Sequence, residues 1–418
     1  MLVEVNVEGD GADDEGHRNR LDELTLLAAA AGAEPVATLQ QRRDRVHPGT
    51  YVGHGKAAEV RDAARRHKAH VIIFDNDLSP AQIRNLEVAV EVKVIDRSEL
   101  ILDIFASRAR THEARLQVEL AQLEYTYPRL RRMWTHLSRM EGGIGTRGPG
   151  ETQLETDRRI VRRRIRDLRR RLRDIDARRE REVRSRGDAL TVGLVGYTNA
   201  GKSSLLNALT QAGVYVADKL FATLDTRTRA WTLPHRVAAL LSDTVGFIRD
   251  LPHHLVASFK ATLEEAVHAD LLLHVVDAST AHVRADVAAV DGVLREIGCR
   301  DRPQILVLNK GDLVTDPAAL DVLRREWPGS VVASAVTGLG LDDLAARVTE
   351  RLVGPPRNVT VRASAADGRL LAWLERHATI LERRAEDAEL VHRVRLPQRL
   401  VEEIPRVAEM GFAVSSEP

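Results

Sequence analysis

The sequence offers neither a pair of cysteines for an intramolecular disulfide bond nor an apolar stretch long enough for a membrane span. Its 418 residues include a single cysteine, Cys299, which excludes an intramolecular disulfide framework and is typical of a cytosolic protein. We interpret Cys299 as a small apolar residue near a helix end rather than as a reactive thiol. No stretch of about 20 uncharged apolar residues occurs, and residues 1–7 alternate like a strand without a signal-peptide core.

An excess of charge is missing as well. Lysine and arginine total 62 and aspartate and glutamate 61, so the net charge is +1 and any attraction to nucleic acid must come from local patches. Hydrophobic residues make up 44% and charged residues 29%, which fits a soluble globular protein. The length is too great for one hydrophobic core, so we expect two to four domains.

The residue pattern predicts an α/β protein in four parts. Alternating strand and helix candidates in residues 1–107 predict a small α/β domain around a parallel sheet. Residues 108–187 carry two heptad stripes, which predict an antiparallel helical hairpin with a glycine-rich tip loop at 141–153. Residues 188–354 predict a nucleotide-binding domain, and residues 355–418 a small α+β domain.

Apolar periodicity also places the individual elements. We expect strands at 2–7, 35–39, 70–75, 91–95, 358–363 and 390–396, and helices near 18–31, 55–67, 80–88, 97–107 and 367–383. Ser79 and Pro80 predict an N-cap followed by proline at the first helical position. The hairpin stripes are Leu116, Leu120, Leu123, Tyr127, Leu130, Trp134 and Leu137, then Val161, Ile165, Leu168, Leu172 and Ile175. Pro128 is expected to kink or break the first hairpin helix.

A phosphate-binding loop is predicted between a strand at 189–195 and the helix that follows it. The pattern G-x-x-x-x-G-K-[ST] is met by Gly196, Tyr197, Thr198, Asn199, Ala200, Gly201, Lys202 and Ser203, with Ser204 directly after it. Such a strand–loop–helix unit directs backbone N–H groups and a positive helix end at a polyphosphate. We expect Lys202 to reach the β- and γ-phosphates and the Ser203 hydroxyl to bind Mg²⁺.

Two further segments carry groups that respond to a γ-phosphate. Asp243 follows an apolar run and can hold Mg²⁺ through water, and Gly246 can offer its N–H to the γ-phosphate. Phe221 and Ala222 precede Thr223, the candidate switch threonine that closes on Mg²⁺. The predicted catalytic residues are Lys202, Thr223 and Gly246.

Guanine specificity is predicted from two later segments. Asp312, in the run Asn309-Lys310-Gly311-Asp312, can accept two hydrogen bonds from guanine donors that adenine lacks. Lys310 can lie over the base, and Ser334 and Ala335 can offer backbone N–H groups to guanine O6. All these motifs occur in this order, each after a predicted strand, and together they predict a GTPase.

The second arm of the hairpin is strongly basic. Residues 156–186 contain fifteen arginines against four aspartates and two glutamates, a surplus of nine positive charges, and no lysine. This composition favours contact with an RNA backbone over a solvated, salt-bridged helix face. The predicted RNA-binding residues are Arg147, Arg162, Arg163, Arg166 and Arg170. The loop 141–153 is either a hinge or an element whose backbone approaches RNA, and its residues leave both open.

Six stretches are longer and more specific than general nucleotide-binding motifs: residues 51–56, 142–157, 196–204, 221–225, 243–248 and 251–256. On these the chain resembles the HflX family of ribosome-associated GTPases, over essentially its whole length. The resemblance implies binding of GTP and GDP and of the large ribosomal subunit with its rRNA, with the hairpin loop directed at the peptidyl-transferase region. It also implies separation of stalled or idle ribosomes into subunits. We expect a cytoplasmic monomer, associated with ribosomes or peripherally with the membrane.

Three positions need separate interpretation. Phe247 stands where many GTPases place a glutamine that orients the attacking water, which implies slow basal turnover and outside help. By the same resemblance, Asn199 is a candidate K⁺ ligand beside the phosphates; the alternative, a hydrogen bond within the loop, stays open. Residues 53–56 resemble a phosphate-binding turn of a second, ATP-using site, although a tight turn entering a helix is favoured.

Three functions compete. The leading one is a GTP-hydrolysing factor that splits or rescues ribosomes. The second is an ATP-dependent rRNA-remodelling enzyme that uses the N-terminal domain, but helicase-type motifs are missing from the sequence. The third is a ribosome-binding module whose GTPase domain acts as a timer; the intact Lys202, Ser203, Thr223 and Asp243 argue against a purely inert version of it.

Overall fold

The computed structural model describes residues 1–7, 14–133, 149–185, 189–210, 227–249, 266–299, 301–386, 389–408 and 412–416. They gather into two compact units, of which the first contains Met1–Ser185 and the second most of the chain that follows. Among the described residues no helix is long and apolar enough to cross a membrane. The predicted boundaries between four domains stay a prediction.

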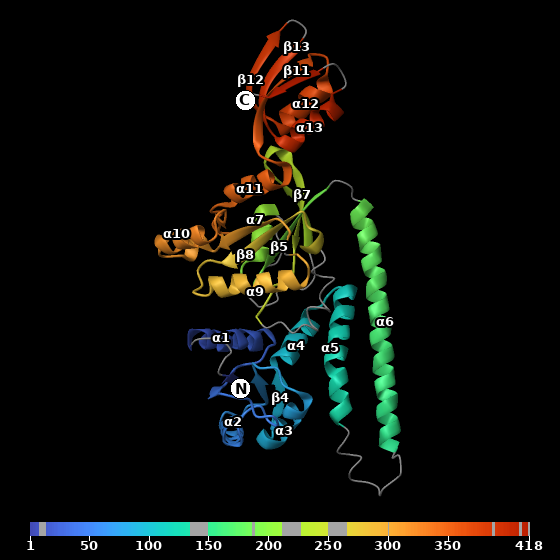
Figure 1. The fold of residues 1–418 in the computed structure, drawn as a ribbon, viewed down its shortest axis with the longest axis vertical. Helices are drawn as coiled ribbons and strands as arrows, with labels where there is room; N and C mark the ends of the chain where they lie inside the picture. The colour runs from blue at the N-terminus through green and yellow to red at the C-terminus, as the bar shows by residue number, and fades with distance from the viewer. Residues whose placement is uncertain are drawn as a thin grey trace. The chain divides into compact units, whose positions relative to one another are not determined.

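The first unit begins with a parallel four-stranded sheet in the order β2-β1-β3-β4 (Figure 1), which confirms the predicted α/β architecture. Five of the six residues of the central strand β1 are buried, because helices cover a parallel sheet on both faces. The strands are β1 Leu2–Val7, β2 Thr38–Arg43, β3 Val71–Phe74 and β4 Lys93–Asp96. The helices are α1 Asp14–Ala30, α2 His54–Arg66, α3 Pro80–Val90 and α4 Arg97–Arg108.

One strand of this sheet lies later in the chain than predicted. The expected strand at 35–39 is β2 at Thr38–Arg43, with the sequence TLQQRR. β2 is an edge strand with alternating exposure, so it tolerates polar residues that apolar periodicity overlooks. The predicted start of α3 is confirmed: Ser79 and Gln82 form a capping box, and Pro80 is the first helical residue.

The predicted helical hairpin consists of α5 His112–Met133 and α6 Pro149–Ser185, which lie side by side in Figure 1. Its seam is the predicted pair of stripes. Leu116, Leu120, Ile165, Leu168 and Leu172 are buried, and Leu123, Tyr127, Val161 and Ile175 pack against them. The side chains of Leu130, Trp134 and Leu137 lie outside the described residues.

Two details of the hairpin differ from the prediction. α5 continues through Pro128 to Met133, so the helix is not broken there. Tyr127 before the proline packs on the seam with α6, and Arg129 after it is held by Asp96 and Glu99. α6 begins at Pro149, inside the stretch 141–153 that was predicted as a loop. Proline suits the first helical turn since its missing N–H has no partner there in any helix.

The second unit contains a six-stranded sheet in the order β10-β9-β8-β5-β7-β6, parallel except for the pair β6–β7. Its strands are β5 Leu190–Gly196, β6 Arg227–Thr232, β7 Ala238–Asp243, β8 Leu271–Asp277, β9 Gln304–Asn309 and β10 Val331–Val332. Its helices are α7 Lys202–Thr210, α9 Val283–Glu296, α10 Pro317–Glu326, α11 Leu341–Val353 and the short η2 Pro234–Arg236 and η3 Gly311–Leu313. The predicted motifs follow the carboxyl ends of parallel strands, which meet at one edge of the sheet.

The unit ends in an antiparallel sheet, ordered β12-β13-β11-β14, with two helices. The elements are β11 Pro356–Ser364, α12 Gly368–His377, β12 Thr379–Glu386, β13 Glu389–Pro397, α13 Gln398–Val407 and β14 Phe412–Ser416. The helix predicted over 367–383 is therefore wrong after His377. Its charged residues favour a helix locally, but pairing of β12 with β13 overrides that propensity.

Candidate nucleotide-binding site

The phosphate loop connects β5 to α7 through positions that only glycine or a strained residue can take. Gly196 has φ +153°, and a Cβ there would lie 2.1 Å from the carbonyl oxygen of Val275. Gly201 has φ +92°, and its Cβ would lie 2.3 Å from Asn309 Nδ2. Asn199 adopts the left-handed region with φ 62° and is exposed at the loop apex. The backbone therefore passes close to β8 and to the end of β9.

The lysine of the loop is held inward. Lys202 is 7% exposed, and its Nζ donates to the carbonyl oxygens of Gly196 over 3.0 Å and Tyr197 over 2.8 Å. Burial lowers the pKa of Lys202 to about 8, and the negative charge of Asp243 acts in the opposite direction. An anionic phosphate is a stronger partner for an ammonium group than neutral carbonyls, so this lysine is suited to bind one.

Two oxygens suited to a metal ion meet beside the loop. Ser203 Oγ, at the start of α7, donates to Asp243 Oδ2 at the end of β7 over 2.6 Å. Asp243 is 0% exposed. Hydroxyl and carboxylate oxygens are the ligands that Mg²⁺ prefers, and the ion commonly keeps several waters. The residues thus fit a hydrated Mg²⁺ that also contacts a phosphate.

The segment after β7 lies against the phosphate loop. Thr198 N donates to Phe247 O over 2.7 Å, and Phe247 N donates to Gly196 O over 3.1 Å. A Cβ on Gly246 would lie 2.9 Å from Thr198 Cα and 3.0 Å from Lys202 Nζ, so glycine is required for this approach. Thr198 Oγ1 is buried and has no hydrogen-bond partner among the described residues. An orphaned hydroxyl here is consistent with a ligand that completes the loop.

The side chains predicted to read the base are gathered by β9. Asn309 Nδ2 donates to Ala200 O over 2.8 Å, and Ala335 N donates to Asn309 Oδ1 over 3.2 Å. Asn309 therefore ties the phosphate loop to the segment after β10. Lys310 has φ 58°, and its Nζ lies 2.7 Å from Asp277 Oδ2 at the end of β8. Asp277 was overlooked, although it follows a buried apolar strand in the same way as Asp243.

The two remaining base-site residues differ in their surroundings. Asp312 is exposed in the short helix η3, so its carboxylate is accessible to a nucleotide. Ser334 N donates to Leu339 O and Ala335 N donates to Asn309 Oδ1, so both N–H groups have protein partners here, and their contact with guanine O6 stays a prediction. The Ser334 hydroxyl instead accepts from the backbone N–H groups of Val336 and Thr337 and fixes the loop.

Sequence reasoning also overlooked a buried histidine under the loop. His274, in β8, is 3% exposed and pairs in register with Val195 of β5. Burial and the charge of Lys202 lower its pKa to about 4, so its contact with Asp291 at 3.7 Å involves a neutral imidazole. A lone histidine in an apolar strand gives no pattern from which this position could be found.

Several predicted residues lie outside the described residues. They are Phe221, Ala222, the switch threonine Thr223 and Arg147 of the hairpin tip. Cys299, by contrast, is described: it is 2% exposed after the end of α9, and burial raises the pKa of its thiol. It is the buried apolar residue that was predicted. In the turn resembling a phosphate site, Gly53 caps α2 and Lys56 pairs with Glu59 at 2.9 Å.

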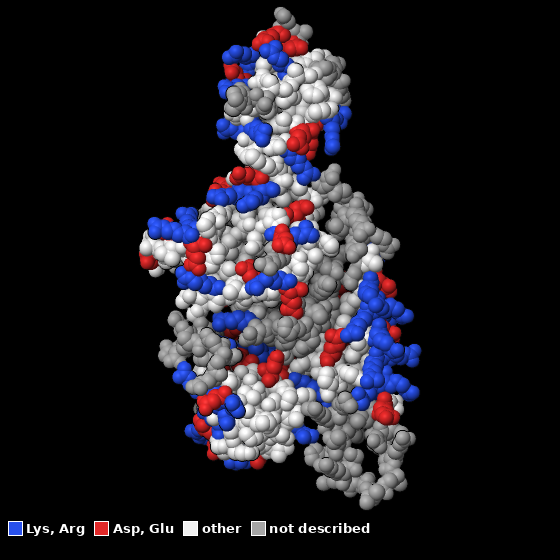
Figure 2. All heavy atoms as spheres, in the orientation of Figure 1, with Lys and Arg blue, Asp and Glu red and all other residues white. Residues whose placement is uncertain are grey.

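The basic arm carries its arginines along α6, where Figure 2 shows basic side chains gathered, all of them arginines. Arg163 and Arg166 are exposed. Arg170 lies 3.9 Å from Asp167, and Arg162 donates to the hydroxyl of Tyr127. Part of the surplus is neutralised elsewhere on α6 by glutamates of α5, through the pairs Arg164–Glu119 and Arg169–Glu124.

The family matches follow one another along the chain in the same order as the parts described above. Four family descriptions match in order: "GTP-binding GTPase N-terminal" over residues 18–106, "GTP-binding GTPase Middle Region" over 108–186, "50S ribosome-binding GTPase" over 191–310 and "HflX C-terminal domain" over 324–416. The GTPase HflX of Escherichia coli is 49% identical over 381 residues, 90% of this chain and 89% of that protein. The GTPase HflX of Lacrimispora saccharolytica is 50% identical over 348 residues, 82% of this chain and 80% of that protein.

The solved structures that resemble this chain are more distant. A GTP-binding protein from Sulfolobus solfataricus in complex with GDP covers 84% of this chain and 99% of its own, at 23% identity and a TM-score of 0.43. The fold and the site together define a P-loop GTPase, an enzyme that binds GTP and hydrolyses it. The chain belongs to the HflX family of GTPases.

Proposed function

We propose that this GTPase binds the large ribosomal subunit through its rRNA and separates stalled or idle ribosomes into subunits, hydrolysing GTP to GDP and phosphate. The observation that carries the proposal is the arginine-rich α6, whose charge surplus is only partly neutralised by α5. A phosphate backbone is the polymer that such a surface attracts. The family description matched by residues 191–310 names a 50S ribosome-binding GTPase, which supports the same partner.

The nucleotide site is proposed to work through the predicted residues. Lys202 and the N–H of Gly246 bind the γ-phosphate, and Asp312 reads guanine. The backbone of residues 196–204 surrounds the phosphates. Ser203, Thr223 and, through water, Asp243 would hold Mg²⁺, which neutralises charge on the β- and γ-phosphates. Asn199 is the proposed ligand for K⁺, which would add positive charge beside the loop.

Hydrolysis by this chain alone is proposed to be slow. Phe247 occupies the position that orients water in many GTPases, and it is 2% exposed within an apolar cluster with Val195 and Leu272. A buried phenyl ring can neither donate nor accept a hydrogen bond to water. Binding to the ribosome would position the attacking water that Phe247 cannot orient. GTP turnover would therefore depend on the presence of the ribosome.

One competing function would use a different nucleotide site. An ATP-dependent rRNA-remodelling enzyme needs a nucleotide site in the N-terminal domain. The turn at Gly53 instead caps α2, and Lys56 is engaged with Glu59. A ribosome-binding module with the GTPase as timer differs only in whether hydrolysis is needed for release. Separate GTP and ATP turnover assays, with and without ribosomes, distinguish the ATP-dependent function from the other two. Release of the protein from the large subunit with GTP, compared with a slowly hydrolysed analogue, distinguishes those two.

The test is sucrose-gradient sedimentation of intact ribosomes with this protein and a slowly hydrolysed GTP analogue. The proposal expects the intact peak to decline, the subunit peaks to grow, and the protein to sediment with the large subunit. With GDP the same protein should leave the intact peak in place. Intact ribosomes that persist at saturating protein and analogue would overturn the splitting function and leave the GTPase assignment standing.

A further inference from the structure

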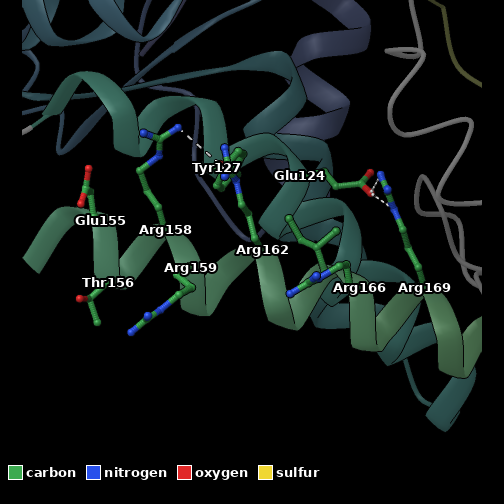
Figure 3. Close-up of a pocket in the computed structure, with 10 residues that line it drawn as sticks. Glu124, Tyr127, Glu155, Thr156, Arg158, Arg159, Arg162, Arg166 and Arg169 are labelled. Atoms are coloured by element: carbon green, nitrogen blue, oxygen red, sulfur yellow. Dashed lines mark hydrogen bonds and ion pairs between the residues drawn. The ribbon is translucent and has the colours of Figure 1, made fainter. Parts of the chain in front are cut away.

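A groove between the two hairpin helices is built from arginines around one aromatic ring (Figure 3). Its volume is about 1030 Å³. Its lining residues are Glu124, Tyr127, Glu155, Thr156, Arg158, Arg159, Arg162, Ile165, Arg166 and Arg169. Five arginines against two glutamates make it net positive, and its size is at the upper end of small-ligand sites.

Tyr127 of α5 organises one side of the groove. Its hydroxyl accepts hydrogen bonds from Arg158 and Arg162, which reach across from α6 in Figure 3. The guanidinium carbons of these arginines lie 5.6 and 5.4 Å from the ring centroid. The ring is only partly buried. A π-face and planar guanidinium groups are thus presented together, as in sites that stack a nucleobase.

The other arginines of the groove are not equivalent. Arg169 is neutralised by Glu124 through hydrogen bonds of 3.1 and 2.8 Å. Within the described residues, Arg159 and Arg166 have no hydrogen-bond or ion-pair partner, and Arg158 Nε is buried without one. Guanidinium donors left without partners in a concave site are suited to phosphate oxygens, which they bind in a bidentate manner.

We infer that this groove binds an unpaired nucleotide of an RNA strand, with its base against Tyr127 and its phosphates on Arg158, Arg159 and Arg166. An aromatic face beside several guanidinium groups favours this ligand over duplex RNA and over an acidic peptide. Duplex RNA presents phosphates but no accessible base face, and an acidic peptide presents neither a base nor a phosphate. Only the source of the strand, the rRNA of the large subunit, rests on the proposed function.

The test uses the full-length chain saturated with GDP, so that the guanine site is occupied. A fluorescent single-stranded oligoadenylate reports binding by anisotropy over a salt series. The pocket variant is the pair Arg159→Gln and Arg166→Gln. The matched control is Arg171→Gln and Arg173→Gln, two exposed positions, which removes the same charge from the same helix outside the groove. Tyr127→Leu tests stacking, and helical circular dichroism verifies that each variant is folded.

The pocket pair should weaken binding by about tenfold and flatten the plot of log affinity against log salt by about 1.4, since each lost phosphate contact removes about 0.7. The control pair should change both quantities clearly less. Tyr127→Leu should weaken oligoadenylate binding at least about fivefold without changing the salt slope. Equal losses in the pocket and control pairs would show a merely electrostatic surface and overturn the inference.

Two further arms separate the alternatives. If free AMP competes as strongly as the oligonucleotide, the ligand is a mononucleotide and the assignment to RNA is overturned. If duplex RNA binds as strongly as the single strand, the assignment to an unpaired nucleotide is overturned. Co-sedimentation of the same variants with large subunits separates this inference from the proposed function. Wild-type protein that binds oligoadenylate through the groove but ignores ribosomes would refute only the function. Pocket variants that keep both oligoadenylate binding and co-sedimentation with large subunits would refute only the groove.

Discussion

Ser203 Oγ and Asp243 Oδ2 lie 2.6 Å apart and join the start of α7 to the end of β7. Neither residue is near the other in sequence, and the parallel pairing of β5 with β7 brings them together. The two oxygens proposed to hold Mg²⁺ are therefore adjacent. This preorganisation reduces the ordering that Mg²⁺ binding would otherwise require.

Lys202 gives the nucleotide site a pH dependence. Its pKa of about 8 lies below the usual value of 10.5, so above pH 8 the empty site increasingly holds a neutral amine. A bound phosphate favours the charged form, and binding should take up a proton. GDP affinity should therefore fall as pH rises above 8, while the empty protein gains stability toward pH 10.5 because the unfolded state binds more protons there.

Calorimetry of GDP binding near pH 9, in buffers with different ionisation enthalpies, measures the proton uptake. Lys202→Met should abolish the uptake and lower affinity. An affinity that is flat across this range, with no proton uptake in the wild type, would remove Lys202 from the phosphate contact.

Asp312→Asn should change the base that is selected. The mutation replaces a double acceptor by a donor and an acceptor, which suits xanthine and leaves guanine N1–H and its amino group without their partner. GDP affinity should fall by about a hundredfold or more, and XDP affinity should rise. Competition with a fluorescent nucleotide measures both. Unchanged GDP affinity would exclude Asp312 from the base site.

Phe247→Ala should leave the basal chemical step nearly unchanged. The phenyl ring carries no polar group, so single-turnover GTP hydrolysis without ribosomes should change by less than about threefold. Stimulation by the large subunit should decrease, since packing with Val195 and Leu272 is lost. Phe247→Leu, which keeps most of the volume, is the control. A hundredfold loss of basal hydrolysis would instead assign the ring a role in the reaction.

Asp96 should prove essential for docking α5 onto the first sheet. It is 1% exposed and accepts hydrogen bonds from Leu78 N, Glu99 N, the Tyr125 hydroxyl and Arg129 Nη2. Asp96→Ala removes the closer of the two ion pairs of Arg129 and leaves the Tyr125 hydroxyl and two backbone N–H groups without their acceptor, so it should lower the free energy of unfolding of this unit by about 3–5 kcal/mol.

The measurement for Asp96 is denaturant-dependent hydrogen exchange of amides in β3 and β4. Asp62→Ala is the control: its carboxylate is 61% exposed, and the loss should stay within about 0.5 kcal/mol. Equal protection in both variants would show that Asp96 does not anchor the hairpin.

The sequence predicted the strand–loop–helix unit around Lys202 better than the terminal domain, for a physical reason. The phosphate loop that contains Lys202 must keep glycines and a lysine at fixed spacing, so residues adjacent in sequence determine its geometry. β12 is charged and helix-prone along its length, and only pairing with β13 makes it a strand. The heptad pattern placed Tyr127 on the seam, but its hydrogen bonds with Arg158 and Arg162 join different helices. Like the contacts of Asp96, they link elements far apart in sequence, and no local pattern predicts them.

The central claim is tested most directly by light scattering of intact ribosomes mixed with this protein and GTP. Wild-type protein should produce a fast fall in scattering as subunits separate. Lys202→Ala and the quadruple variant Arg162→Gln, Arg163→Gln, Arg166→Gln and Arg170→Gln should each lose it, the second with GDP binding intact. Full-rate splitting by Lys202→Ala without nucleotide, or by the quadruple variant across a salt series, would contradict the account.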